Sequence, residues 1–130
     1  MTRDGFESET PSAEFDLKRL AEISGGDGEF EREIAGEYVS QSRTLLDDLS
    51  RAIESGDPSA LRRTAHTLKG SSRTIGAQGV AGLAAQIERL DPTTNAEAAA
   101  AVLGRARASL SVVEQTLDGY FGSDEYRRAA

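Results

Sequence analysis

The sequence lacks cysteine entirely and contains a single histidine, His66. Without cysteine the chain can form no disulfide, no thiolate metal site and no thiol nucleophile, and a reducing compartment is permitted. With one histidine, a zinc site would have to fill its remaining positions with carboxylates or water, which is unusual in proteins. We therefore expect the chain to bind no metal ion and no cofactor of its own.

The sequence also lacks the long apolar runs that enter membranes. No stretch approaches the ~18 consecutive apolar residues of a spanning helix, and the N-terminal MTRDGFESET has no apolar core of a signal peptide. The net charge of −7 gives no general basis for binding nucleic acid or anionic lipid. These absences predict a cytoplasmic protein with neither a membrane partner nor a nucleic-acid partner.

The 130 residues fit one domain with a single modest core. We expect residues 1–12 to be a flexible polar segment, residues 13–121 to form the domain, and residues 122–130 to be a polar tail. Met1 favours a protein that stands alone over a domain excised from a longer chain. Thirteen arginines against two lysines, with abundant alanine and glycine, point to a GC-rich, bacterial genome.

Apolar residues recur at steps of three and four in five consecutive segments, which predicts five helices. Asp, Pro, Gly and Asn residues separate these segments in the positions expected of helix caps and helix stops. The predicted helices are FDLKRLAEI, residues 28–54, residues 58–75, residues 78–90, and a last helix that follows a cap at Thr93, Thr94 or Asn95 and ends near residues 120–122.

The apolar faces of these helices predict the core and the fold. No segment alternates with the period of two that is typical of a strand. Four long amphipathic helices joined by short turns predict an all-α fold, an antiparallel four-helix bundle with the short N-terminal helix capping one end. The predicted core residues are Leu17, Leu20, Ile23, Phe30, Ile34, Tyr38, Leu45, Leu49, Ala52, Leu61, Ala65, Leu68, Ile75, Val80, Leu83, Ala84, Ile87, Leu90, Val102, Ala106, Leu110, Val113 and Leu117.

The stretch AHTLKGSSRTIGA carries the histidine on the third predicted helix. At about 100° per residue, Arg62, Lys69, Gly70 and Arg73 all lie within about 60° of His66 around that helix. Residues 61–73 hold four basic residues and no acidic one. His66 is therefore predicted to lie on a local positive patch of an acidic protein.

A lone histidine on a helix is more often an ordinary surface residue, but three neighbouring features favour a function for His66. Cations favour the neutral imidazole, whose ring nitrogen is nucleophilic. Lys69, one turn away, could pair with a phosphoryl group. Gly70 weakens the helix by about 1 kcal/mol relative to alanine, and such a glycine usually permits close approach. Together these features predict a phosphoryl acceptor that a partner can reach.

Other chemistries fit the same residues less well. The order Lys69-Gly70-Ser71 reverses that of a phosphate-binding loop and lies inside a helix, so we expect neither kinase nor ATPase activity. Ser71 and Ser72 point away from His66 on a helix, which leaves no serine–histidine pair for hydrolysis.

The stretch resembles the core motif of histidine-containing phosphotransfer (HPt) domains, H-x-x-K-G-[SA]-[SA]-x-x-x-G. The segments LKRLAEISGGDGEFEREIAGEYV, DPSALRRTAHTLKG and GVAGLAAQIERL resemble neighbouring helices of that family, so the likeness covers roughly residues 15–118. The motif positions are matched by His66, Lys69, Gly70, Ser71, Ser72 and Gly76.

The resemblance implies a phosphorelay intermediate of two-component signalling. Such a protein exchanges phosphoryl groups with aspartates of response-regulator receiver domains and with a (hybrid) histidine kinase, without hydrolysing ATP itself. On this likeness His66 would be phosphorylated on Nε2, Lys69 would stabilise the phosphohistidine, and Gly70 would give the partner access. The Mg²⁺ ion of the reaction would belong to the receiver domain.

The resemblance also implies a partner-binding surface around the histidine. Arg62, Arg63 and Arg73 would attract the acidic, Mg²⁺-binding pocket of a receiver, and Ser71 would lie at the contact. Glu88 occupies a position in the fourth predicted helix where the family often has an acidic or amide residue near the histidine. Its other interpretation is a solvated helix face.

Two functions remain open on the sequence alone. The chain is a phosphorelay intermediate with His66 as acceptor, or it is a helical adaptor that docks a receiver or kinase through the same basic face without accepting phosphate. The complete His-Lys-Gly set favours the first function, since an adaptor need not keep the histidine. In either case we expect a monomer, because an exposed His66 face suits a partner rather than a dimer seam.

Overall fold

The computed structural model describes residues 14–122, and within that range every regular element is a helix. The predicted flexible segment 1–12 lies outside the described residues, and so does all but the first residue of the predicted tail 122–130. The all-α prediction is confirmed. The helices are α2 (Leu17–Ser24), α3 (Gly28–Ser55), α4 (Pro58–Ile75), α5 (Gln78–Glu88) and α6 (Ala96–Phe121).

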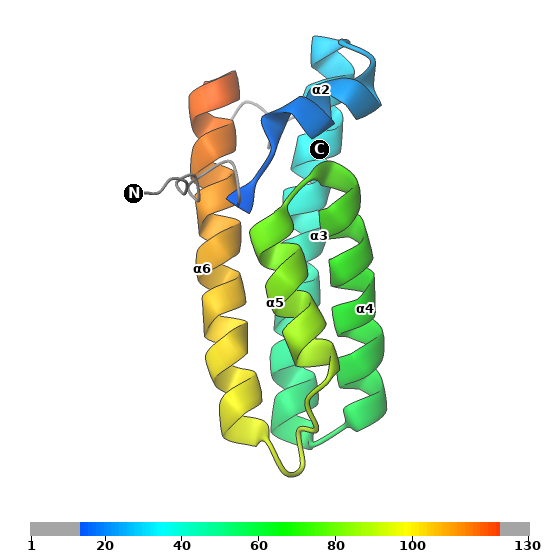
Figure 1. Ribbon diagram of the computed structural model, residues 1–130, viewed down its shortest axis with the longest axis vertical. Coiled ribbons are helices and arrows are strands. Elements are labelled where there is room, and N and C mark those ends of the chain that lie inside the picture. Colours follow the sequence, from blue (N-terminus) through cyan, green and yellow to red (C-terminus); the bar gives the residue numbers. More distant parts are fainter. Residues whose placement is uncertain (1–13, 123–130) are drawn as a thin grey trace, which may run out of the picture.

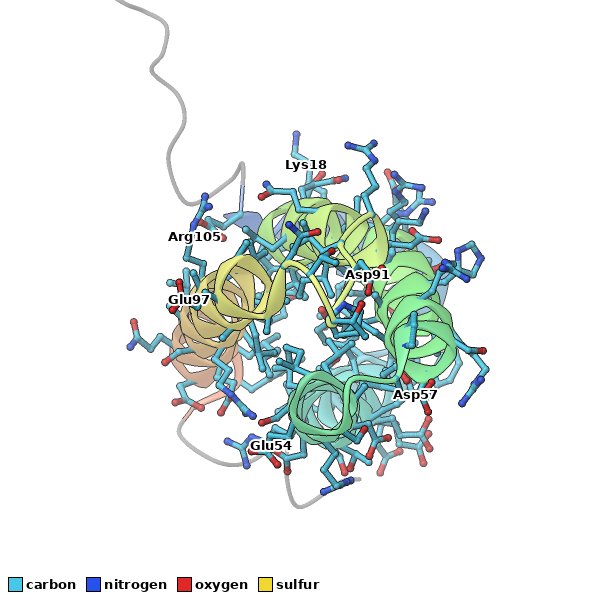
Figure 2. The ribbon with its side chains drawn as sticks, turned by 90° about the horizontal axis from the view of Figure 1, so that it is seen from below. Lys18, Glu54, Asp57, Asp91, Glu97 and Arg105 are labelled. Atoms are coloured by element: carbon cyan, nitrogen blue, oxygen red, sulfur yellow. The ribbon has the colours of Figure 1, made fainter. Side chains whose placement is uncertain are left out.

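Four of these helices form an antiparallel bundle, and α2 lies across one end of it (Figure 1). Helix α3 packs against α4 and α6, and α5 packs against the same two helices, so α4 and α6 are diagonal neighbours. Figure 2 looks along the bundle from the end with the α3–α4 turn, marked by Glu54 and Asp57, and the α5–α6 loop, marked by Asp91. The predicted bundle with a short capping helix is confirmed.

The helix boundaries follow from caps that the sequence encodes. The carboxylate of Asp27 accepts hydrogen bonds from the backbone N–H groups of the first turn of α3, and Asp57 does the same for α4. At the other ends, Gly56 and Gly76 adopt the left-handed conformation that closes a helix with little strain only in glycine. These local signals explain why α4 ends at the predicted residue 75 and α3 ends at Ser55, one residue after the predicted end.

Two predictions around the α5–α6 loop were inaccurate. Helix α5 ends at Glu88, so Leu90 lies beyond it, half-buried in the loop. Asn95 is the residue before α6, but its side chain caps no N–H group of that helix. Its Oδ1 atom instead accepts from the backbone N–H of Asp91 and from the hydroxyl of Thr94. The side chain of Asn95 therefore forms hydrogen bonds within the loop and does not form the helix cap that the sequence pattern predicted.

The core lies along the axis of the bundle and agrees with the predicted apolar faces except at one residue. Every predicted core side chain except Phe30 is buried or half-buried. Phe30, in the first turn of α3, is 46% exposed. The largest fully buried side chains are Leu20, Leu46, Leu49, Leu61, Leu68, Ile87, Leu117, Val39, Val80 and Val113.

The residues before and within α2 hold the turn between α4 and α5. The backbone N–H of Asp16 donates to the carbonyl of Gly76 at 2.9 Å, and Nε of Arg19 donates to the carbonyl of Thr74 at 3.2 Å. Gly76 has φ +89°, and a Cβ atom on it would lie 2.8 Å from Cβ of Arg19. The turn therefore requires glycine both for its backbone conformation and for this close approach.

Replacing Gly76 by alanine should destabilise the protein by about 1–3 kcal/mol, because it adds left-handed strain and a steric clash. The matched control is Gly82→Ala within α5, where a Cβ atom would meet nothing within 4 Å. That control should stabilise the protein by about 0.5–1 kcal/mol. The free energy of unfolding in urea would measure both changes. A Gly76→Ala variant as stable as the parent would contradict this account of the turn.

Candidate functional site

His66 lies on the solvent-facing side of α4. Its side chain is 69% exposed, whereas Ala65 and Leu68 on the same helix are fully buried. The hydrophobic pattern explains this orientation, since the apolar residues of α4 turn toward the bundle axis and leave His66 on the outer face. The predicted exposure of the histidine is confirmed.

The carboxylate of Glu88, at the end of α5, bridges two side chains of α4. The Nδ1 atom of His66 donates to Oε2 of Glu88 at 2.9 Å, and Nζ of Lys69 donates to Oε1 at 2.7 Å. The side chains of Glu88 and Lys69 are only 21% and 18% exposed. The solvated-face interpretation of Glu88 is therefore wrong.

The contact with Glu88 determines which ring nitrogen of His66 is reactive. An ionised carboxylate only accepts hydrogen bonds, so Nδ1 carries the proton. In the neutral imidazole, Nε2 then holds the lone pair. The Nδ1 edge of the ring is held against Glu88 of α5. The Nε2 lone pair therefore lies on the opposite edge of this exposed side chain. The arrangement presents a nucleophilic nitrogen in a defined orientation.

The charge of Glu88 is stabilised by its neighbours. The hydrogen bond from Lys69 is the largest cause that lowers the pKa of Glu88 below its ordinary value. The hydrogen bond from His66 and the charges of both neighbours lower this pKa further, while partial burial opposes them. Glu88 is therefore a carboxylate at neutral pH. Glu88 supplies a negative charge beside His66. The sequence of α4 did not predict this charge, because residues 61–73 contain no acidic residue.

Gly70 lies one turn from His66 on α4, about 100° around the helix axis from Lys69. It is exposed inside α4, and a Cβ atom on it would meet nothing within 4 Å. The fold itself therefore has no packing reason for glycine at this position. The imidazole has one side closed by the Lys69–Glu88 pair and one side left open over Gly70.

The three predicted arginines, Arg62, Arg63 and Arg73, lie on α4 together with His66. All three are exposed. Arg62 faces the α5–α6 loop, where its charge adds to the hydrogen bonds from Thr93 that chiefly lower the pKa of Asp91. Arg63 lines a shallow cavity on the other side, between α4 and α3. The basic face is therefore spread over both flanks of the histidine.

Ser71 is not brought to the imidazole. Its hydroxyl donates to the carbonyl of Leu68 at 3.3 Å. It lines a groove of about 330 Å³ between α2, α3 and α4, together with Ile23, Ile34, Glu37, Tyr38, Gln41, Thr74 and Ile75. This groove could not be predicted from the sequence, because no spacing rule relates residues on α2 and α3 to a face of α4.

Within residues 14–122, no group of three or more His, Asp or Glu side chains is placed to hold a metal ion. Over the same residues, no helix is both long enough and apolar enough to cross a membrane.

Known proteins are similar to this chain in sequence or in fold. The chain is 32% identical over 83 residues to the phosphorelay intermediate protein rdeA of Dictyostelium discoideum, an alignment that covers 64% of this chain and 33% of the relative. It thus spans about a third of that relative's length.

A solved structure has the same fold. The crystal structure of histidine-containing phosphotransfer protein B (HptB) from Pseudomonas aeruginosa matches with a TM-score of 0.70 and 25% sequence identity, covering 88% of this chain and 96% of that one. The family model of the Hpt domain matches residues 33–118, a range that contains the whole bridge between His66, Lys69 and Glu88. The chain belongs to the Hpt domain family.

Proposed function

We propose that this chain is a phosphorelay intermediate that accepts a phosphoryl group on Nε2 of His66 and exchanges it with aspartates of receiver domains. The observation that carries the proposal is the hydrogen bond from Nδ1 of His66 to Glu88. It leaves the lone pair on Nε2, on a side chain that is 69% exposed. Family membership and the phosphorelay relative support the same function.

The transfer needs no proton to move. The Nε2 lone pair attacks the phosphorus of an aspartyl phosphate, the Nε2–P bond forms, and the P–O bond breaks with its electron pair returning to the aspartate carboxylate. The ring keeps its Nδ1 proton and becomes cationic. In the reverse direction a carboxylate oxygen attacks phosphorus and the electron pair of the N–P bond returns to Nε2. Catalysis then consists of positioning and charge neutralisation.

Lys69 is the residue that we assign to stabilising the phosphoryl group. Its ammonium carries three donors, of which the bond to Glu88 uses one. The remaining donors can turn toward a phosphoryl group on the neighbouring ring while the pair with Glu88 persists. A charge-assisted bond of this kind offsets part of the negative charge that the phosphoryl group brings.

The partner that fits this surface is a receiver domain with an acidic pocket that holds Mg²⁺, the one metal ion in the proposed reaction. Arg62, Arg63 and Arg73 would draw that pocket toward His66 from both flanks and raise the association rate. A partner seated over Gly70 would reach Ser71 and the groove beside it. The phosphoryl group would come from a hybrid histidine kinase, through its receiver.

We further propose that the protein acts as a monomer in a bacterial cytoplasm, without kinase or ATPase activity. The exposed face of α4 supports a monomer, because the partner needs the same surface that a dimer would cover. The absence of cysteine is compatible with a reducing compartment.

Replacing His66 by glutamine should abolish phosphorylation of this protein by charged receivers, because the accepting nitrogen is lost. Receiver domains charged with acetyl phosphate and Mg²⁺ would be mixed with the parent and with the variant. Acid-labile, base-stable phosphate should appear on the parent only. Circular dichroism would show that the variant remains folded, since the side chain of His66 is exposed.

The same assay separates the two functions left open by the sequence. A His66→Gln variant that still acquires phosphate would disprove the acceptor role. Tight binding of several receivers without any phosphohistidine would identify the chain as a docking adaptor instead.

Replacing Gly70 by alanine should separate stability from function. The new methyl group enters open space in the free protein, so the free energy of unfolding of the variant should be about 0.5–1 kcal/mol higher than that of the parent. In the complex it would stand between two packed surfaces, which costs about 1–3 kcal/mol and slows transfer about tenfold or more. Gly82→Ala is the matched control, since it makes the same change on α5 and should leave transfer unchanged. Equal transfer rates in the two variants would contradict the access role of Gly70.

Replacing Arg73 by alanine should slow association with a receiver a few-fold at low salt, and this difference should shrink as salt screens the charges. Arg105→Ala is the control, because Arg105 is an exposed arginine on α6, diagonally across the bundle from α4 (Figure 2). Stopped-flow binding at two ionic strengths would measure both rates. If the two variants associate equally fast, the basic face of α4 does not guide the partner.

A further inference from the structure

The groove between α2, α3 and α4 combines an apolar lining with one acidic side chain. Its volume is about 330 Å³. The apolar lining comes from Ile23, Ile34, Tyr38 and Ile75, and Glu37 is the one charged residue among the side chains that line it. A groove of this kind fits an aromatic or aliphatic side chain that has a positive charge next to it.

The same face of α3 continues toward the start of that helix with a second carboxylate and an exposed ring. Phe30, Glu33, Ile34 and Glu37 are related by spacings of three and four, so they share one face. Phe30 is 46% exposed, and Phe30 and Glu33 line a second hollow. Within residues 14–122, no cation forms an ion pair with Glu33 or Glu37. Both carboxylates are therefore open to a cation from elsewhere.

The C-terminal segment of the chain, residues 123–130, begins beside this face. The hydroxyl of Tyr120, near the end of α6, donates to the carboxylate of Glu31 in the first turn of α3 at 3.1 Å. The end of α6 and the start of α3 thus meet at the end of the bundle that α2 covers (Figure 1). The C-terminal segment reads SDEYRRAA and places an aromatic residue directly before two arginines.

We propose that the C-terminal segment docks on α3 of its own chain, with Tyr126 in the groove and the two following arginines beside Glu33 and Glu37. In this position it competes with the partner protein for the surface next to Ser71. The competition rests on the proposed function, in which a receiver seated over Gly70 reaches the groove. The docking itself does not depend on that function.

The segment is long enough to reach the groove and needs only a weak contact to occupy it. Tyr126 lies four residues beyond Gly122, and an extended chain spans about 14 Å over four residues. A short tether holds such a segment at an effective concentration on the order of millimolar. A contact made by one aromatic ring and one or two exposed ion pairs should then be formed about half of the time.

The N-terminal residues 1–13 fit the groove less well. The described chain starts at Glu14, whose carboxylate accepts a hydrogen bond from Ser109 of α6 at 2.6 Å and lies beside Gly79 of α5. These residues therefore leave the bundle at α5 and α6, whereas the groove belongs to α2, α3 and α4. Residues 1–13 also hold three acidic side chains and one basic one, which Glu37 would repel. Residues 126–130 hold two arginines and no acid.

The test of docking places a nitroxide at the end of the C-terminal segment. The chain has no cysteine, so Ala130→Cys gives a single labelling position in the full chain. Docking predicts that the label broadens the amide NMR signals of residues 34–41. Tyr126→Ala, which changes no charge, should reduce this broadening about twofold or more, and Glu37→Gln should do the same through the lost ion pair.

Each variant has a matched control. Ser123→Ala changes the same segment outside the proposed contact. Glu97→Gln removes the same charge from an exposed acid in the first turn of α6, at the other end of the bundle (Figure 2). Both controls should leave the broadening unchanged. Equal broadening in Tyr126→Ala and the parent would overturn the inference, because the segment would then only hang near α3.

A mixed sample distinguishes docking within one chain from docking between two copies. Nitroxide-labelled protein without ¹⁵N would be mixed with ¹⁵N protein that carries no label. Docking within the chain predicts no broadening of residues 34–41 in this mixture. Broadening there would overturn the inference, since the groove would then hold the segment of a second copy.

Competition with the partner is measured by stopped-flow binding to a receiver domain. A groove that is covered about half of the time lowers the apparent affinity about twofold. Tyr126→Ala should therefore bind a receiver about twofold more tightly than the parent, and Ser123→Ala should bind like the parent. Equal binding by Tyr126→Ala and the parent would disprove the competition. If no receiver binds any of these proteins, the proposed function fails, whereas docking seen by NMR stands.

Discussion

The packing of α5 against α4 is the constraint on which the site depends. His66 and Lys69 stand on one helix, and the carboxylate that orders them comes from the other. That carboxylate reaches them only because the chain reverses tightly at Gly76, where the residues before α2 close over the turn. A backbone conformation at one end of the helix pair thus governs the orientation of an imidazole near its middle.

The two sides of the imidazole differ in character. On one side a partly buried ion pair between Lys69 and Glu88 gives rigidity, and on the other a helix surface without a side chain at Gly70 leaves room. A nucleophile that must meet a second protein needs both, since a loosely held ring reacts slowly and a crowded ring cannot be reached. The arrangement suits a protein whose substrate is a residue of a partner rather than a small molecule in a pocket.

The sequence predicted the features that are local in the chain. The exposure of His66, with Lys69 and Gly70 on the same face, follows from the angular period of one helix, and the ends of α3 and α4 follow from Asp and Gly caps. The role of Glu88 could not be predicted in this way, because it depends on how far α5 is shifted along α4. Phe30 was misassigned for a related reason, since periodicity shows which face is apolar and not whether another helix extends far enough to cover it.

The contacts of residues 14–19 bear on where this domain begins. The Hpt family match starts at residue 33, within α3. Phe15 and Leu20, however, are buried in the common core, and Asp16 and Arg19 bond to the turn that joins α4 and α5. A fragment cut at the family boundary would lose part of its core together with the restraint on that turn. The cooperative folding unit is therefore larger than the unit recognised by sequence similarity, and a transplanted domain should carry the residues from Glu14 onward.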